Sequence, residues 1–472
     1  MKRSAVINVV GLCRRCIGEH TPYIQKFLMR HGGVDVQPQV PAVTCTMQAT
    51  YLTGKPPSEH GIVGNGWYDR DLAEVQFWKQ SNHLVSGNKL WESIRAERPD
   101  FVTAKLFWWY NMYSSAEFTI TPRPMYPADG RKVFDIYTHP MEMREEIKEA
   151  LGSFPFHTFW GPGAGLPCSQ WIADSCRWVE EKHQPDLSLL YLPHLDYSFQ
   201  RFGPDLSKVG DDLREIDQLV ESLVTFLESR EIEVTLLSEY GITPVDQPIH
   251  INRIFRDQGW LTIKDEMGLE ILDAGASQAF AVADHQVAHV YVRDSEDLER
   301  VLQCCAQIEG VESVLWGESR AAAGLDHPRA GDIVLISDSK SWFTYYYWQE
   351  DARAPDFARC VDIHRKPGYD PVELFLDPRK KLPKVTIARK LIQKKLGFRM
   401  LMDLIPLDAT LVKGSHGRCP EDPLDWPMLL GPAAPTDRAS ISACEVHELL
   451  KQAATLPTPT KHERHTQTKQ EN

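Results

Sequence analysis

The sequence predicts an α/β fold with a mostly parallel sheet sandwiched by helices. Short apolar runs recur along the chain, at residues 5–10, 102–107, 187–192, 234–237 and 333–336. Runs that are apolar on both faces are typical of parallel strands covered by helices on each side. Between two of these runs, Leu213, Ile216 and Val220 recur three or four residues apart, which predicts an amphipathic helix over 211–229. Strands that alternate with helices indicate α/β architecture.

Changes of pattern along the 472 residues predict how the chain is divided. Residues 1–270 carry the first part of the core, and residues 411–454 return to it. Within the first part, residues 108–165 are rich in aromatic residues, Pro and Met, which predicts an inserted loop region over a site or, alternatively, a structural cap. Residues 271–410 predict a smaller subdomain or insertion, because their strands are shorter and their loops longer. The polar residues 455–472 predict a disordered tail.

The balance of charge argues against binding to nucleic acid. The chain has 52 Lys and Arg against 65 Asp and Glu, a formal net charge of −13, and an acidic surface repels phosphate backbones. Its apolar runs are all shorter than the ~18 residues that a membrane-spanning helix needs. The N-terminus is typical of a buried strand rather than a signal peptide, and the ten irregularly spaced cysteines favour reduced thiols. We therefore expect a cytoplasmic protein without a membrane span.

The most informative segment is residues 41–54, PAVTCTMQATYLTG. Thr44 stands nine residues before Thr53, and Asn65 stands 21 residues after Thr44 in a His-Gly-Ile-Val-Gly-Asn run. These spacings, with the Trp-Tyr-Asp sequence at 67–69, closely resemble the nucleophile segment of type I phosphodiesterase/nucleotide pyrophosphatases in the alkaline phosphatase superfamily. The resemblance implies an alkaline-phosphatase-like core and hydrolysis of a phosphoester, with Thr44 as nucleophile and Asn65 as the second catalytic residue.

The residue types suit that chemistry on physical grounds. A hydroxyl at the start of a helix lies near backbone N–H donors and the positive end of the helix dipole, where a phosphoryl group is stabilised and an alkoxide forms more easily. An amide side chain such as that of Asn65 can donate to a non-bridging phosphoryl oxygen in the transition state. Cys45 and Thr46 are rival nucleophiles that the spacing disfavours.

The family's metal-binding positions are only partly retained. Asp196 and His416 match an Asp and a His that bind the first metal in the family, and Glu239 replaces an Asp ligand. Three ligands are lost, because the corresponding positions are Val10, Gln200 and Tyr240. Asn8 lies on the same strand face as Val10 but too far back to replace its ligand. An intact two-zinc site is therefore not expected. The resemblance implies a divalent metal (zinc, magnesium or manganese) with fewer than two zinc ions, held by Asp196, His416, Glu239 and Gln200.

Other residues are alternative candidates for the missing ligands. His194 precedes Asp196 by two residues and would share a face with it if the preceding strand continued. An alternative cluster combines Asp284, His285 and His289 with Asp362 and His364. A hydrogen-bonded Asp/His pair in the core, or a solvated loop, explains each of these groups equally well.

The expected partner is a small phosphorylated or nucleotide-type substrate. Candidate substrate-binding residues are Trp67, Tyr68, Trp108, Trp109 and Arg365, because aromatic rings can stack on a base and a guanidinium can bind a phosphate. The rival interpretation, suggested by the lost ligands, is a catalytically silent superfamily member that binds a phosphorylated metabolite or a protein partner. The sequence leaves the oligomeric state open.

Overall fold

The computed structural model describes residues 3–362 and 365–455. At its centre lies a nine-stranded sheet of order β21-β2-β20-β9-β1-β8-β5-β6-β7. Its strands are β1 (Arg3–Val9), β2 (Gly33–Gln37), β5 (Thr103–Leu106), β6 (Phe118–Pro122), β7 (Ile136–His139), β8 (Leu187–Leu192), β9 (Ile232–Leu237), β20 (Met428–Leu430) and β21 (Ser440–Ser442). The middle strands β9, β1, β8, β5 and β6 pair in parallel, whereas β20 and β7 pair antiparallel to their neighbours. Four of the five apolar runs thus form strands of the predicted parallel sheet.

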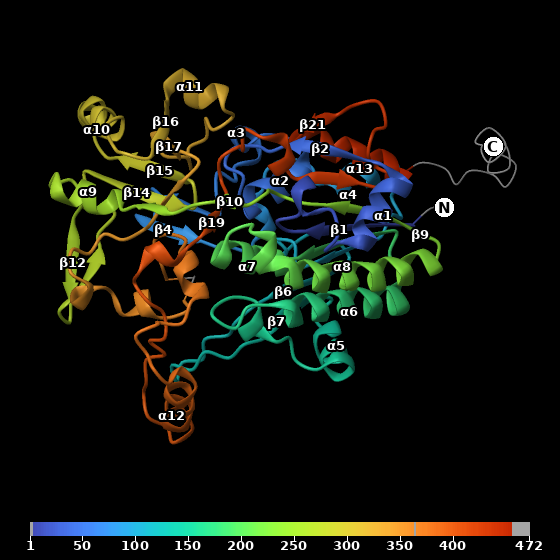
Figure 1. Cartoon of the computed structure of the whole chain (residues 1–472), viewed down its shortest axis with the longest axis horizontal. Helices are drawn as coiled ribbons and strands as arrows, with labels where there is room; N and C mark the ends of the chain where they lie inside the picture. Colours follow the sequence, from blue (N-terminus) through green and yellow to red (C-terminus); the bar gives the residue numbers. More distant parts are fainter. Residues whose placement is uncertain (1–2, 363–364, 456–472) are drawn as a thin grey trace, which may run out of the picture.

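Helices cover both faces of this sheet (Figure 1). One face carries α1 (Pro22–His31), α6 (Leu166–His183) and α8 (Leu206–Ser229), and the other carries α2 (Thr44–Thr53), α4 (Leu90–Arg95) and α13 (Val446–Thr455). The amphipathic helix expected at 211–229 lies within α8, and its apolar positions are buried in the core. The predicted helix–sheet–helix sandwich is therefore present.

A second, four-stranded sheet lies beside the main one, with order β14-β15-β17-β16. Its strands are β14 (Ala279–Asp284), β15 (Val287–Val292), β16 (Val311–Trp316) and β17 (Ile333–Ser337), and they pair antiparallel. The apolar run at 333–336 belongs here, so its assignment to the parallel sheet was wrong. Both faces of β17 are covered within this smaller sheet, which gives it the same apolar pattern as a parallel strand. Beside this sheet lie α9 (Ile251–Asp257), α10 (Leu298–Cys305) and α11 (Gly317–Ala322).

Several short elements lie outside these two sheets. Four two-stranded pairs are formed by β3 (Gly66–Asp69) with β4 (Glu74–Phe77), β10 (Thr243–Pro244) with β19 (Gly414–Ser415), β11 (Gln247–Ile249) with β18 (Ser341–Phe343), and β12 (Ile263–Glu266) with β13 (Leu269–Leu272). The remaining helices are α3 (Pro57–His60), α5 (Met143–Leu151), α7 (His194–Phe202) and α12 (Pro383–Lys395). The aromatic-rich segment 108–165 contributes β6 and β7 to the edge of the main sheet as well as loops near its end.

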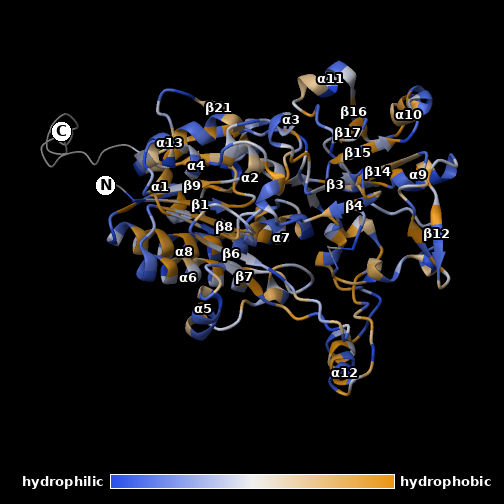
Figure 2. Ribbon diagram, turned by 180° about the vertical axis from the view of Figure 1, so that it is seen from behind, coloured by the Kyte–Doolittle hydropathy of each residue, from blue (hydrophilic) through white to orange (hydrophobic). Residues whose placement is uncertain are grey.

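One helix stands apart from both sheets. Helix α12 projects from the body of the molecule, and Figure 2 shows apolar and polar residues side by side on it. Elsewhere the apolar residues concentrate on the strands and on the helix faces that contact them. Among the described residues, the structure contains no helix that is both long and apolar enough to cross a membrane.

Candidate active site

A small pocket lies where β1, β8 and β9 end, which is the edge of a parallel sheet that commonly binds ligands. Its volume for water-sized molecules is about 40 Å³. It is lined by Thr44, Asn65, Trp78, Trp109, Phe159, Trp160, Tyr191, Asp196, Tyr197, Tyr240, His285, Tyr369 and His416. Both predicted catalytic residues and two of the predicted metal ligands thus face one cavity.

Thr44 is the first residue of α2, so its hydroxyl lies at the positive end of that helix. The Thr44 Oγ1 atom lies 3.1 Å from the Tyr240 hydroxyl, which in turn donates a 3.1 Å hydrogen bond to Asp196 Oδ1. Burial raises the pKa of Asp196 to about 7, because a charged carboxylate is poorly solvated there. A hydroxyl, a phenol and a carboxyl therefore form one hydrogen-bonded chain.

Asn65 is held beside the helix start by two partners. Its Oδ1 accepts a 3.0 Å hydrogen bond from the Cys45 backbone N–H, and its Nδ2 donates a 3.0 Å bond to Asp284 Oδ1. Asp284 Oδ2 also accepts from the Asn65 backbone N–H at 2.8 Å. The amide nitrogen carries two hydrogens, and the bond to Asp284 uses one of them. Asp284 therefore orients Asn65 and does not belong to a separate metal cluster.

Glu239 lies behind this pocket in a network of amides. Its Oε1 accepts hydrogen bonds from Asn8 and Gln48, and Gln48 Oε1 accepts a 2.7 Å bond from the backbone N–H of Trp109. Burial raises the pKa of Glu239 to about 8, so the side chain is mostly protonated at neutral pH. Asn8, judged from the sequence to lie too far back for metal binding, contacts Glu239 instead.

His416 and His285 are neutral bases in a stack of rings. The ring of Tyr240 lies 3.6 Å from that of His416 with an angle of 4°, and the His285 ring centre lies 3.8 Å from that of His416. Burial lowers the pKa of His416 to about 3 and that of His285 well below its usual value. His416 Nδ1 lies 2.8 Å from the Ala42 carbonyl, to which it donates as the protonated nitrogen. Its Nε2 lies 3.9 Å from Asp196 Oδ1.

Two pocket residues have unusual backbone geometry. Trp78 has φ 56° and His285 has φ 60°, in the left-handed region that non-glycine residues rarely adopt. Such conformations persist where the surrounding contacts fix them, and they cluster at functional sites.

The residues at the family's metal positions do not fit a two-zinc centre. Val10 offers no donor atom, and the Tyr240 hydroxyl fills the position between Thr44 and Asp196 that a bridging cation would need. The Tyr240 ring also covers one face of His416. Glu239 is bound by amide donors, which compete with a cation for its oxygen. Among the described residues, no group of three His, Cys, Asp or Glu ligand atoms gathers at this pocket.

Several predicted substrate-binding residues lie elsewhere. Trp67 packs under the guanidinium of Arg329, Tyr68 packs on Tyr291, and Trp108 is buried in the core with its Nε1 donating to the Leu190 carbonyl. Arg365 is exposed and pairs with Asp362. Trp109 alone of these residues lines the pocket, where its ring packs on Trp78.

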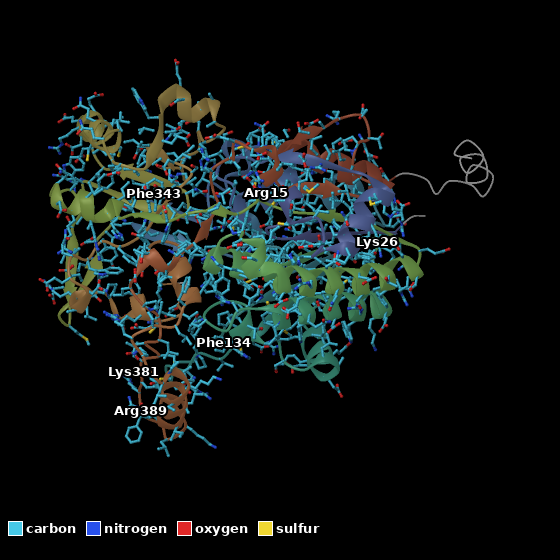
Figure 3. All side chains as sticks on the ribbon, in the orientation of Figure 1. Arg15, Lys26, Phe134, Phe343, Lys381 and Arg389 are labelled. Carbon is cyan, nitrogen blue, oxygen red and sulfur yellow. The ribbon has the colours of Figure 1, made fainter. Side chains whose placement is uncertain are left out.

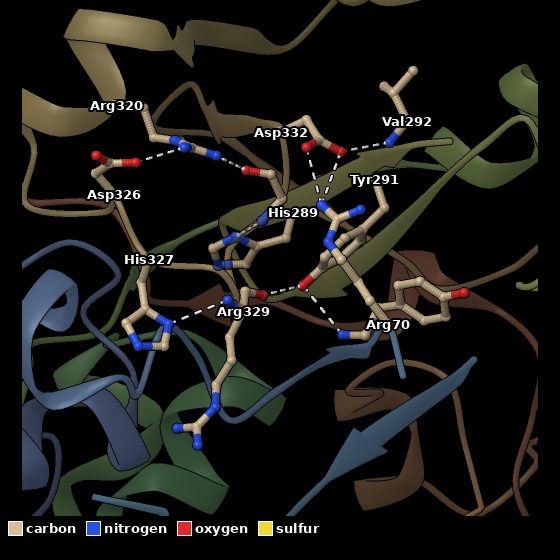
Figure 4. A network of polar contacts seen from close by, with 11 residues as sticks. Arg70, His289, Tyr291, Val292, Arg320, Asp326, His327, Arg329 and Asp332 are labelled. Atoms are coloured by element: carbon tan, nitrogen blue, oxygen red, sulfur yellow. Dashed lines mark hydrogen bonds and ion pairs between the residues drawn. The ribbon is translucent and has the colours of Figure 1, made fainter. Parts of the chain in front are cut away.

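The alternative metal cluster is not assembled. His289 lies in a separate polar network with its Nε2 2.8 Å from the Val63 carbonyl and its Nδ1 accepting from Gly331 (Figure 4). Asp362 pairs with Lys132 and Arg365 on another segment, and His364 lies outside the described residues. Of the four described members of this cluster, His285 alone lines the pocket, and Asp284 contacts it through Asn65.

The suggestion that His194 compensates for the lost ligands was wrong. The strand ends at Leu192, and His194 is the first residue of α7, so the alternation of a strand does not apply to it. Its ring faces Asp212 and Glu215 of α8. Gln200, on the last turn of α7, is buried near Asp196.

Sequence reasoning missed most of the aromatic wall of the pocket. Tyr191 and Tyr197 lie close to Asp196 in the sequence, but an aromatic residue beside a buried strand usually packs in a core. Trp160 and Tyr369 come from distant loops, and their rings pack 5.2 Å apart. No spacing in the sequence links these two residues.

Comparisons with known proteins extend this description. A family model described as type I phosphodiesterase/nucleotide pyrophosphatase matches residues 4–370. A Schizosaccharomyces pombe protein named an uncharacterized pyrophosphatase/phosphodiesterase is 27% identical over 218 residues, covering 44% of this chain. The alignment spans only 37% of that protein's length.

Two solved structures have a similar fold. Murine ectonucleotide pyrophosphatase/phosphodiesterase 5, an inactive variant in complex with AMP, has a TM-score of 0.56 at 14% identity, covering 97% of this chain and 96% of that one. Phosphonoacetate hydrolase from Sinorhizobium meliloti, in complex with phosphonoacetate, has a TM-score of 0.59 at 12% identity, covering 96% of both chains. The predicted fold class is confirmed by these similarities.

Proposed function

Because the chain belongs to the type I phosphodiesterase/nucleotide pyrophosphatase family, we propose that it hydrolyses a small phosphoester with Thr44 as nucleophile. The observation that carries this proposal is the hydrogen-bonded chain from Thr44 through Tyr240 to Asp196. A threonine hydroxyl is a weak nucleophile until a base removes its proton. The chain connects it to a carboxyl group whose pKa is about 7.

The proton follows this chain as the Thr44 oxygen attacks phosphorus. The Thr44 hydroxyl gives its proton to the Tyr240 oxygen, while the Tyr240 proton moves to Asp196 Oδ1. The bond from phosphorus to the leaving oxygen breaks on the side opposite Thr44, and the leaving group departs as an anion. Water then attacks the phosphothreonine, the proton held by Asp196 returns through Tyr240 to the cleaved Thr44 oxygen, and the proton lost by the attacking water neutralises the departed anion. Asp196 ends the cycle as a carboxylate.

Charge that develops on the phosphoryl oxygens has two sources of stabilisation. The N-terminus of α2 presents backbone N–H groups and the positive end of its dipole. Asn65 adds the second hydrogen of its amide nitrogen, and Asp284 fixes the direction of that amide. A fixed donor of this kind acts on the transition state without first having to reorient.

The charge of the pocket favours a phosphodiester over a phosphomonoester. Its lining residues include no Lys or Arg, and the two histidines on its wall are neutral. A doubly charged monoester would be desolvated without a compensating cation, whereas a diester carries one negative charge. The volume of about 40 Å³ is smaller than the ~150 Å³ of a cavity known to hold benzene, so the lining side chains must move before an aryl ester can enter.

The proposed reaction does not use a metal ion. The expectation of a divalent cation (zinc, magnesium or manganese) held by Asp196, His416, Glu239 and Gln200 stays a prediction, and the donor set does not favour it. The second candidate function is a catalytically silent binding protein for a phosphorylated metabolite. The three substituted ligand positions, Val10, Gln200 and Tyr240, favour that candidate.

Hydrolysis of methyl p-nitrophenyl phosphate and of p-nitrophenyl phosphate, in chelator and with added cations, tests the proposal. We expect faster release of p-nitrophenol from the methyl diester, activity in chelator, and loss of activity in Thr44→Ala but not in the matched control Thr46→Ala. Absence of turnover of either ester under all conditions, with retained binding of phosphate, would favour the silent binding protein. Activity that appears only with an added cation would refute the metal-free proton chain.

A further inference from the structure

A second cluster of ligand-type side chains lies away from the pocket, between α7 and α8. His194 Nε2 lies 3.3 Å from Glu215 Oε2 and 3.7 Å from Asp212 Oδ1. All three ligand atoms lie within 4.8 Å of one another. Asp212 and Glu215 are three residues apart on α8, so both point from one face of that helix toward His194.

The imidazole of His194 has no hydrogen-bond partner. The residue is 2% exposed, and neither ring nitrogen forms a hydrogen bond within the described part of the chain. A buried polar atom without a partner is unfavourable. The Nε2 atom of His194 faces the two carboxylates across 3.3 and 3.7 Å.

The spacing suits a small cation. In a tetrahedral zinc site, with ligand bonds of about 2.0–2.2 Å, the ligand atoms lie roughly 3.3–3.5 Å apart. The two observed distances from Nε2, 3.3 and 3.7 Å, are close to this value. The carboxylates are partly exposed, with side-chain exposures of 29% for Asp212 and 52% for Glu215. A fourth ligand, water, can therefore approach from outside.

We propose that His194, Asp212 and Glu215 form a zinc-binding site that clamps the start of α7 to α8. Imidazole nitrogen and carboxylate oxygen both bind zinc. The ion would satisfy the buried Nε2 atom and neutralise two carboxylates that face each other. This site is separate from the proposed function, because no pocket residue contributes a ligand.

Isothermal titration of the chelator-treated protein with zinc tests the site. We expect one zinc ion per chain and at least a 100-fold weaker affinity in Asp212→Asn/Glu215→Gln, both at exposed positions that should fold normally. Asp211→Asn, a neighbouring exposed carboxylate, is the matched control and should bind zinc as the unchanged protein does. Asp196→Asn/His416→Gln should also keep the zinc, which separates this site from the pocket.

Thermal melts give a second measurement on the same proteins. Zinc should raise the melting temperature of the unchanged protein and leave that of Asp212→Asn/Glu215→Gln unmoved. The proposal is overturned if no zinc binds, if the double variant binds it equally well, or if binding is lost only in Asp196→Asn/His416→Gln.

An independent observation concerns the protruding helix α12. Residues 378–402 contain nine Lys and Arg and no Asp or Glu, in a chain of net charge −13. The same segment exposes seven large apolar side chains, each 44–68% accessible: Leu382, Val385, Leu391, Ile392, Leu396, Phe398 and Leu401. The labelled Lys381 and Arg389 lie on this protrusion, away from the body (Figure 3). Apolar and cationic groups thus meet solvent together.

Val385 and Ile392 lie seven residues apart on one face of α12, and Leu396 follows directly after the last helical residue, Lys395. Arg389 lies beside that face on one side, and Lys384 and Lys395 lie beside it on the other. A helix of this kind suits an anionic bilayer surface, where apolar side chains enter the acyl boundary and bases meet the phosphate groups. Each Lys or Arg near such a surface strengthens the attraction.

We infer that residues 379–401 dock on an anionic lipid surface. We choose a lipid surface because the segment and the lipid have opposite charges. The rest of the molecule is acidic and would be repelled by anionic lipid, so this protrusion is the part that can make the contact. The alternative partner is an acidic protein with a groove that receives this helix. In that case the chain would not bind lipid vesicles.

Cosedimentation with vesicles tests the inference. The full chain should bind phosphatidylcholine vesicles that contain 30% phosphatidylserine (about a third anionic lipid), should not bind pure phosphatidylcholine, and should bind less as salt rises. Lys384→Glu/Lys394→Glu/Lys395→Glu should abolish binding, while Lys26→Glu/Lys264→Glu/Lys340→Glu, an equal charge change elsewhere, should weaken it far less.

The apolar contribution has its own pair of variants. Ile392→Ser/Leu396→Ser should weaken vesicle binding at least tenfold, whereas Met267→Ser, at a side chain that is 97% exposed on another hairpin, should not. Binding to neither vesicle, equal binding to both, or equal loss in the two lysine triples would overturn the inference.

Discussion

Replacing Tyr240 by Phe isolates the proton chain of the pocket. The change deletes one oxygen and keeps the ring that stacks 3.6 Å from His416. It removes two hydrogen bonds of 3.1 Å, one shared with Thr44 Oγ1 and one donated to Asp196 Oδ1. The nucleophile and the carboxyl group are then no longer connected through a hydrogen-bonding atom.

The expected effect on catalysis is large. A positioned general base contributes typically about 10²–10⁴-fold to a rate, so kcat should fall by roughly that factor. The hydrogen bond from Tyr240 lowers the pKa of Asp196, so the pH at which the remaining activity rises should move upward. Stability should fall by about 1–3 kcal/mol, the cost of leaving a buried acceptor without its donor.

Tyr51→Phe is the matched control. Tyr51 is also completely buried, and its hydroxyl donates a 2.8 Å bond to the Ser238 carbonyl rather than to a pocket side chain. It should lose a similar amount of stability and keep its kcat. The measurements are kcat and its pH profile for the methyl diester, with thermal melts on both variants. Equal kcat values for the two variants, or an unshifted pH profile in Tyr240→Phe, would refute the proton chain.

Thr44→Ala should abolish turnover, whereas Thr44→Ser should keep a measurable fraction because it retains a hydroxyl. Thr46→Ala should change kcat little. Full activity without the Thr44 hydroxyl would show that the nucleophile is another residue. Asn65→Ala should lower kcat by about 10²–10³-fold, the usual value of one oxyanion donor; a variant that is less stable but has normal specific activity would contradict this. Between pH ~6.5 and 8 the free energy of unfolding should fall as pH rises. In the folded protein the pKa values of Asp196 and Glu239 are about 7 and 8, above their unfolded values of 3.8 and 4.5. The folded state therefore binds more protons than the unfolded state in this range. Buried histidines with lowered pKa values act in the opposite direction only below their unfolded pKa of 6.5. Thermal melts across this range measure the slope, Glu239→Gln should reduce it, and a flat or rising profile would contradict the assignment.

The central sheet and the start of the site could be predicted from the sequence because they rest on local patterns. The apolar runs mark strands directly, and the spacing of Thr44, Thr53 and Asn65 lies within one short segment. In the structure, Asn65 Oδ1 accepts from the backbone N–H that follows Thr44. A sequence motif of this length encodes one helix start and the loop that lies beside it.

Contacts between distant segments could not be predicted in the same way. From the sequence, Tyr240 is only a lost metal ligand. In the structure its hydroxyl contacts both Thr44 and Asp196. Asp284 lies 219 residues from Asn65 in the chain yet fixes its amide. His194 was placed on the wrong face because the end of a strand, set here by Pro193, is the least certain boundary to read from residue patterns.

The aromatic wall around the pocket has a consequence for timing. The cavity of about 40 Å³ admits water more readily than an ester. Substrate can therefore enter only after the surrounding rings move apart, those of Trp78, Trp109, Trp160 and Tyr369. Apparent affinity is then the intrinsic affinity multiplied by the fraction of molecules that are open. The same rings must part again for product to leave, and such opening steps take microseconds to milliseconds in proteins with lids. Turnover in this pocket would then be limited by the motion of side chains at four positions that are far apart in the sequence. Mutations that loosen their packing would speed entry while letting bulk water into the pocket.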